Sequence, residues 1–99
     1  MEKDKYITEV IFRKFNDGEI LALFPYDIFN HRGGVTSYVH VGQHGEADYR
    51  HCVNRTNLAT EQEYKDLKEE LESIGYNLKA VKKRDAGKYL TAYKNSLIQ

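Results

Sequence analysis

"YITEVIFRKFNDGEILALFP", residues 6–25, is the stretch that decides the fold. Its first half is rich in β-branched and aromatic residues, which predicts a strand over 6–15. Asp17-Gly18 follows, a pair typical of tight hairpin turns because glycine accepts a positive φ at no steric cost. The returning segment is apolar on both faces, which favours a central place in a sheet. Pro25 has no N–H to give to a sheet ladder, so we expect it to end that strand.

The stretch 60–75 predicts one amphipathic helix. Thr60 and Glu63 have the spacing of a capping box, in which each side chain accepts a hydrogen bond from the other residue's backbone N–H. Apolar residues recur along one face at helical spacing, at Tyr64, Leu67, Leu71 and Ile74. Gly75 is placed to end the helix in a left-handed cap. The alternating segment 76–83 predicts a strand after the helix.

These elements predict an α+β fold with a small, mostly antiparallel sheet. The expected order is β-β-β-β-α-β, with one main helix packed on one face of the sheet. We expect a single domain over residues 1–83 and a basic tail over 84–99. Apolar residues recur at helical spacing in the tail and Asp85 is suited to cap a helix there, although Gly87 weakens that prediction.

Composition indicates an ordinary globular protein. The 99 residues are 40% hydrophobic and 30% charged, and the formal net charge is zero. Cys52 is the single cysteine, so an internal disulfide is excluded. The charged first residues do not resemble a signal peptide, and no stretch approaches the ~18 apolar residues of a membrane span. We therefore expect a cytoplasmic protein without a membrane partner.

A second stretch, "YVHVGQHGEADYRHC" at residues 38–52, holds three of the four histidines and the cysteine. If 35–41 and 47–53 pair as a hairpin with Val41 opposite Ala47, the pattern sorts into one apolar and one polar face. The polar face and the loop tip then hold the candidate binding residues, which are Tyr38, His40, Gln43, His44, Asp48 and Arg50. In this register His40 faces Asp48.

A resemblance to a known family rests on three segments of the sequence, which are "IFRKFNDGEILALFP", "SYVHVGQHGEADY" and "ATEQEYKDLKEELESIGYNLKAV". Over about residues 6–83 the chain resembles a family of small uncharacterised bacterial proteins, some of them carried by phages or mobile elements. The resemblance implies one compact cytoplasmic domain. That family has no known activity, so the resemblance assigns no role to any residue of this chain.

Metal binding and catalysis are two further hypotheses for the second stretch. His40, His44 and Asp48 are competent zinc ligands, but Gly42 and Gly45 interrupt the helix that their spacing would need. For Cys52 as a nucleophile, His51 points to the opposite face of a strand. A base formed by His40 with Asp48 has better geometry, yet no oxyanion device accompanies it. We therefore predict no metal, no cofactor and no catalytic residue, and an enzyme remains the weaker alternative.

Charge is unevenly spread along the chain. Residues 1–75 carry nine basic and fourteen acidic side chains, whereas residues 76–99 carry six basic and one acidic. A nucleic-acid-binding protein is therefore one alternative, with phosphate contacts from Lys79, Lys82, Lys83, Arg84 and Lys88. The sequence pI of about 6.9 is low for that class.

The leading prediction is a non-enzymatic protein-interaction module. A sheet covered by a helix on one side leaves a second face, and the tyrosine, arginine and histidine expected there are typical of binding surfaces. The expected partner is another protein, with a homodimer as one option.

Overall fold

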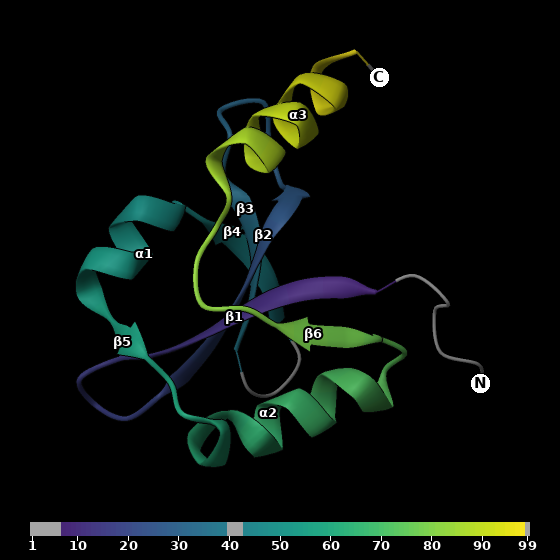
Figure 1. Ribbon diagram of the computed structural model, residues 1–99. Helices are drawn as coiled ribbons and strands as arrows, with labels where there is room; N and C mark the ends of the chain where they lie inside the picture. The colour runs from purple at the N-terminus through teal and green to yellow at the C-terminus, as the bar shows by residue number, and fades with distance from the viewer. Residues whose placement is uncertain (1–6, 40–42, 99) are drawn as a thin grey trace.

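The computed structural model describes residues 7–39 and 43–98 of the chain. Within these residues, six strands form one sheet and three helices pack against it, which confirms the predicted α+β class (Figure 1). The strands are β1 Thr8–Lys14, β2 Ile20–Ile28, β3 Val35–Val39, β4 Gln43–Ala47, β5 Asn57–Leu58 and β6 Leu78–Ala80. The helices are α1 Tyr49–Arg55, α2 Glu61–Ser73 and α3 Ala86–Leu97.

The sheet is antiparallel from β4 through β3, β2 and β1 to β5. β6 pairs with β1 in parallel, beside the part of β1 that β5 leaves unpaired. The predicted first hairpin is confirmed: Gly18 has φ +93°, and the Phe15 N–H donates to the Glu19 carbonyl over 2.9 Å. β2 is central, as the apolar residues on both of its faces indicated.

Pro25 does not end β2, which continues to Ile28. The β2–β3 register shifts between Phe24 and Ile28, so the irregularity falls where the proline stands. A break of register removes the need for a donor at that position, which is how a proline is accommodated inside a strand. Its ring is fully buried, so the same position contributes to the core.

Helix α2 covers one face of the sheet. Its capping box is formed as predicted: the Glu63 N–H donates to Thr60 Oγ1 over 3.2 Å, and the Thr60 N–H donates to Glu63 Oε1 over 2.9 Å. Leu67 and Leu71 are buried against apolar side chains from the strands, which are Val10, Phe12, Ala22, Phe24 and Tyr38. Gly75, with φ +114°, ends the helix as expected.

The opposite face of the sheet is covered as well, which corrects the expectation of an open second face. A second buried cluster on that face consists of Ile11, Leu21, Leu23, Val35 and Ala47. Tyr49 and Cys52 of α1 pack against it, together with Val81 and Tyr89 from the C-terminal part of the chain. Figure 1 shows α2 below the strands, with α1 and α3 at other sides of the sheet. The polar sheet face that was expected to bind a partner is therefore not present among the described residues.

A strand was predicted over residues 47–53, but β4 ends at Ala47 and residues 49–55 form helix α1. The Asp48 side chain accepts a hydrogen bond from the His51 N–H over 3.0 Å, which makes Asp48 the N-cap of that helix. Strands β3 and β4 pair with Val35 opposite Ala47 and Tyr38 opposite His44. The predicted register is therefore wrong, and Asp48 lies beyond the end of the ladder. His40 lies outside the described residues.

The C-terminal segment is helical, as the periodicity and Asp85 indicated. The Asp85 side chain accepts from the Lys88 N–H over 2.9 Å at the start of α3. Strand β6 is shorter than the predicted 76–83. Among the helices described, none has the length and apolar character that crossing a membrane requires.

Candidate functional site

Arginine and tyrosine side chains meet in a pocket of about 450 Å³ where the β2–β3 loop, the end of β4 and the chain around Arg84 come together. We call it the arginine pocket and define it by Arg32, Glu46, Tyr49, Arg50, Arg84 and Tyr89. It joins Arg50, predicted from the second stretch, to Arg84, predicted from the C-terminal segment. It does so because α1 and α3 both pack on the same face of the sheet.

Arg84 is held between two aromatic rings. Its guanidinium carbon lies 4.1 Å from the Tyr49 ring centroid and 3.7 Å from the Tyr89 ring centroid. Both contacts are within the range of cation–π attraction, and arginine suits this position because its guanidinium is planar. The guanidinium carbon thus lies over both rings, and its N–H groups remain able to bind an anion.

Both rings are fixed by hydrogen bonds at their hydroxyl groups. The Tyr89 hydroxyl donates to the Gly33 carbonyl over 2.7 Å. The Tyr49 hydroxyl accepts a hydrogen bond from the backbone N–H of Arg84 over 2.9 Å. A side chain whose neighbours are fixed in this way loses less conformational entropy on binding a ligand. The pocket is thus preorganised around Arg84.

Gly33 permits this arrangement. Its φ is +87°, and a Cβ there would lie 2.5 Å from the Tyr89 hydroxyl oxygen. The neighbouring Tyr93 hydroxyl donates to the His31 carbonyl over 2.6 Å, so α3 is tied to the β2–β3 loop at two points. Gly33 is therefore a point at which the β2–β3 loop contacts α3.

The two acids of the pocket are engaged with groups of the protein itself. Glu46 Oε1 lies 3.4 Å from Arg32, and Glu46 Oε2 accepts from the Asn30 side chain. Asp48, which also lines the pocket, serves as the N-cap of α1. Within residues 7–39 and 43–98, the guanidiniums of Arg50 and Arg84 make no hydrogen bond or ion pair. These two cations are therefore available to an external anion.

The other predicted binding residues do not join this pocket. Tyr38 is only 2% exposed and belongs to the core beneath α2, where its hydroxyl lies 2.5 Å from Glu70 Oε2. His44 is exposed, and its Nε2 lies 2.9 Å from the Tyr76 hydroxyl. Gln43 begins β4. The candidates of the second stretch therefore separate into different parts of the molecule.

The basic set proposed for nucleic acid is divided too. Lys88 contacts Glu9, lies 4.6 Å from the Tyr26 ring centroid, and its pKa is raised by the hydrogen bond to Glu9. Lys79 lies in β6, whereas Lys82 and Lys83 are exposed in the connection that leads to Arg84. The segment thus presents fewer unpaired cations than its composition indicates.

Cys52 is poorly suited to nucleophilic chemistry. Burial raises the pKa of its thiol, and the nearby Asp48 carboxylate raises it further. A thiol with a raised pKa holds its proton at neutral pH, whereas catalysis needs the thiolate. In the part of the chain that the structure describes, no group of three or more potential ligands is placed to hold a metal ion.

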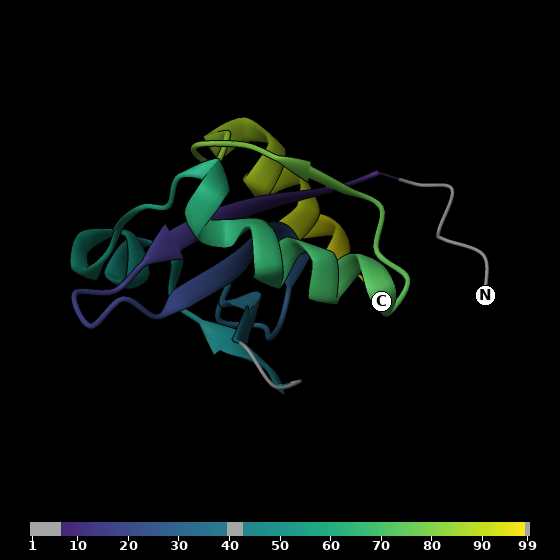
Figure 2. The same cartoon turned by 90° about the horizontal axis from the view of Figure 1, so that it is seen from below.

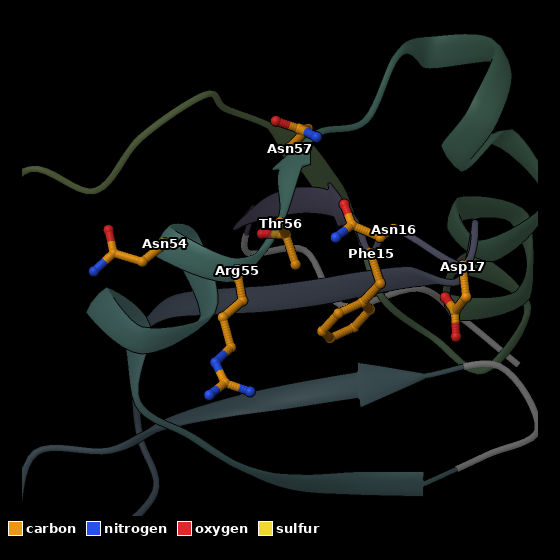
Figure 3. Close-up of a pocket in the computed structure, with 7 residues that line it drawn as sticks. All are labelled: Phe15, Asn16, Asp17, Asn54, Arg55, Thr56 and Asn57. Atoms are coloured by element: carbon orange, nitrogen blue, oxygen red, sulfur yellow. The ribbon is translucent and has the colours of Figure 1, made fainter.

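A second hollow, of about 580 Å³, lies where the β1–β2 turn meets the end of α1 (Figure 3). Its lining consists of Phe15, Asn16, Asp17, Asn54, Arg55, Thr56 and Asn57. In Figure 3 the side chains of Phe15 and Arg55 both extend toward the strands drawn beneath them, while Asn54 points away to the left. Asp17 Oδ1 accepts the Glu19 N–H over 3.0 Å within the turn. Most of the lining residues are polar, but none of them carries a charged group set over aromatic rings as Arg84 does.

Comparison with family models, with curated proteins and with solved structures found no match for this chain. The functional argument therefore rests on the geometry of the described residues.

Sequence reasoning missed Arg32 and Tyr49 as members of a site. Tyr89 fits the nucleic-acid alternative as a ring on which bases could stack, but no pattern in the sequence places it beside Tyr49. The signal that was available is the tyrosine content of the chain, eight residues with no tryptophan. Tyrosine has an apolar ring and a polar tip, so it suits a place that is partly core and partly contact surface.

Proposed function

We propose that this chain is a non-enzymatic protein-interaction module that binds an acidic segment of a partner protein at the arginine pocket. The observation that carries the proposal is the clamped Arg84, whose N–H edge has no anionic partner among the described residues. Arginine binds carboxylates through two parallel hydrogen bonds, which gives both affinity and orientation.

The neighbourhood of Arg84 supports the same proposal. Arg50 supplies a second unpaired guanidinium, and Tyr49 and Tyr89 supply aromatic surface next to the charge. Arginine and tyrosine are enriched among the residues that contribute most to protein interfaces. Because the pocket is assembled from three separate parts of the chain, its shape depends on the folded structure, as a specific contact surface requires.

The test uses a fluorescently labelled oligo-glutamate peptide and measures its anisotropy as the protein is titrated. We expect saturable binding that weakens at least about tenfold in Arg84→Gln, since a charge-assisted bidentate contact is lost. Arg84→Lys should also weaken binding, because an ammonium neither stacks on two rings in the same way nor offers a planar fork. The matched control is Lys65→Gln, which removes an exposed cation from α2 on the other side of the sheet.

A parallel titration with a single-stranded oligonucleotide of equal charge separates the two classes of partner. Tighter binding of the oligonucleotide, with a steep dependence on salt, would replace the proposal by the nucleic-acid alternative. Equal weakening in Arg84→Gln and Lys65→Gln would show that binding follows overall charge and not the pocket.

A further inference from the structure

The two edges of the sheet differ in how they are protected. On the β1 side, two short segments cover the strand: β5 pairs with Arg13 and Lys14, and β6 pairs with residues 8–10. The outer segment β6 is three residues long and carries an exposed lysine at its centre, Lys79. Short edge strands and edge lysines are devices that prevent one sheet from pairing with another.

The β4 edge has none of these devices. β4 is the last strand in the sheet order, and its five residue pairs with β3 show no shift of register. It contains no proline and no lysine. In Figure 2 β4 lies at the lower margin of the molecule, with no other described helix or strand beyond it. Among the described residues no strand pairs with the outward N–H and C=O groups of β4, so these groups can pair with a further strand.

The sequence of β4 is complementary to itself about Gly45. If two copies of β4 align antiparallel with Gly45 opposite Gly45, His44 of each copy stands opposite Glu46 of the other. Directly opposed side chains have Cβ atoms roughly 4.5–5.5 Å apart, so the imidazole and the carboxylate come within hydrogen-bond reach. The arrangement produces this contact twice, as a two-fold axis requires.

We propose that a second copy of this chain pairs with the β4 edge in this register, which joins the two sheets into one continuous sheet across a two-fold axis at Gly45. His44 and Glu46 are both exposed, so each is accessible to the second copy. His44 uses Nε2 toward Tyr76, which leaves Nδ1 for the opposing carboxylate. Gly45 adds no side chain at the axis.

The groups that face this contact within one copy are compatible with it. Glu46 already accepts from Asn30 and Arg32, yet a carboxylate has about four lone-pair sites and retains capacity for a further donor. Glu46 lines the arginine pocket as well, but the dimer does not depend on the proposed binding of an acidic segment, because neither Arg50 nor Arg84 takes part in the β4 contact.

The test measures molar mass by light scattering and sedimentation over a concentration series of the full chain. We expect a monomer–dimer equilibrium. In His44→Glu the dimer dissociation constant should rise at least about tenfold, because two pairs of like charges then stand directly opposed. His44→Gln is the matched control: it also loses the ring and its contact with Tyr76, but it adds no charge. Its side-chain amide can still donate to the opposing Glu46, so it should keep most of the dimer.

Amide hydrogen exchange on the unchanged chain provides a second readout that does not depend on a variant. Protection of residues 44–47 should increase with protein concentration, while that of β6 at the other edge should not. A monomer at every concentration up to the solubility limit would overturn the proposal. So would a dimer that His44→Glu leaves intact and that gives residues 44–47 no added protection, because the contact would then lie elsewhere.

Discussion

At the scale of single residues, Arg13 shows how one side chain connects the sheet to a helix end. It lies on β1, and its guanidinium donates to the Val53 carbonyl over 3.0 Å, to the Thr56 carbonyl over 2.6 Å and to Thr56 Oγ1 over 2.9 Å. The last carbonyls of a helix lack partners within the helix. Arg13 supplies those partners at the end of α1, and so fixes the helix that carries Tyr49 and Arg50.

Replacement of Arg13 by methionine should lower the free energy of unfolding by about 2 kcal/mol, since hydrogen bonds from a charged donor are lost while the apolar stem is kept. Urea unfolding followed by circular dichroism measures the change. Arg55→Met is the control, because Arg55 is an exposed residue of the same helix. If the two variants unfold at the same urea concentration, the Arg13 contacts contribute nothing to stability.

The reactivity of Cys52 provides a second prediction at this scale. Burial, followed by the Asp48 carboxylate, raises the pKa of the thiol, so the thiolate fraction near neutral pH is below that of an exposed cysteine. Alkylation by iodoacetamide should therefore be slower in the folded protein than in the same chain in denaturant. The rate should increase with pH beyond the range where an exposed cysteine has reached its plateau. Asp48→Asn should shift that rise to lower pH.

At the scale of elements, the N-terminus of α2 is stabilised by the capping box of Thr60 and Glu63, which also contacts strand β1. Lys14 of β1 contacts Glu63, and this hydrogen bond is the main cause that lowers the pKa of Glu63 from its usual 4.5, followed by the Thr60 backbone N–H. A carboxyl whose pKa is lowered on folding stabilises the protein above its unfolded pKa. The stabilisation is lost as the pH falls through the lower, folded pKa.

Thr60→Ala should destabilise the protein by about 1 kcal/mol, the usual effect of removing a helix N-cap. Glu63→Gln should unfold at a lower temperature than the unchanged chain near neutral pH, and the difference should disappear below the folded pKa of Glu63. Thermal unfolding between neutral and acidic pH measures both variants. A Glu63→Gln difference that persists unchanged in acid would show that the charge of Glu63 is not the cause.

The elements also show which parts of the fold the sequence predicts and why. The first hairpin and α2 follow from local rules, namely Asp17-Gly18 and the capping box, which need no other part of the chain. α1 was predicted as a strand because apolar and polar residues alternate over 47–53, although the same short segment is also compatible with a helix. Whether this segment forms a strand or a helix depends on whether Asp48 pairs in the sheet or caps the helix. The sequence of so short a segment does not distinguish the two.

The candidate site was harder to predict than the fold for a related reason. Arg50 and Arg84 were each identified, but in different hypotheses, because nothing local indicates that they meet. Their pocket forms through contacts between residues far apart in the chain. One example is the hydrogen bond from the Arg84 backbone N–H to the Tyr49 hydroxyl, which joins residues 35 positions apart. Tyr38 was expected on a surface because its face of the sheet was predicted to be open, whereas α2 covers that face. A pocket built by tertiary contact is visible only once the packing of both helices is known.

At the scale of the whole molecule, the basic C-terminal segment is structural as well as charged. Tyr89 packs on the second core cluster, and α3 is tied to the β2–β3 loop through Gly33 and His31. The same contacts that build the arginine pocket therefore cover one face of the sheet. This makes stability and the proposed binding depend on the same segment.

Truncation after Lys83 tests that dependence. It removes Tyr89 and both contacts of α3 with the β2–β3 loop, and exposes apolar side chains that α3 now covers. We expect the free energy of unfolding to fall by about 3 kcal/mol or more, a large part of the total for a domain of this size, in urea unfolding followed by circular dichroism. Truncation after Leu97 is the matched control, since it removes Ile98, which is 80% exposed, and should leave stability unchanged. If the longer truncation unfolds at the same midpoint as the full chain, residues 1–83 are stable by themselves, and α3 belongs to the binding surface and not to the core.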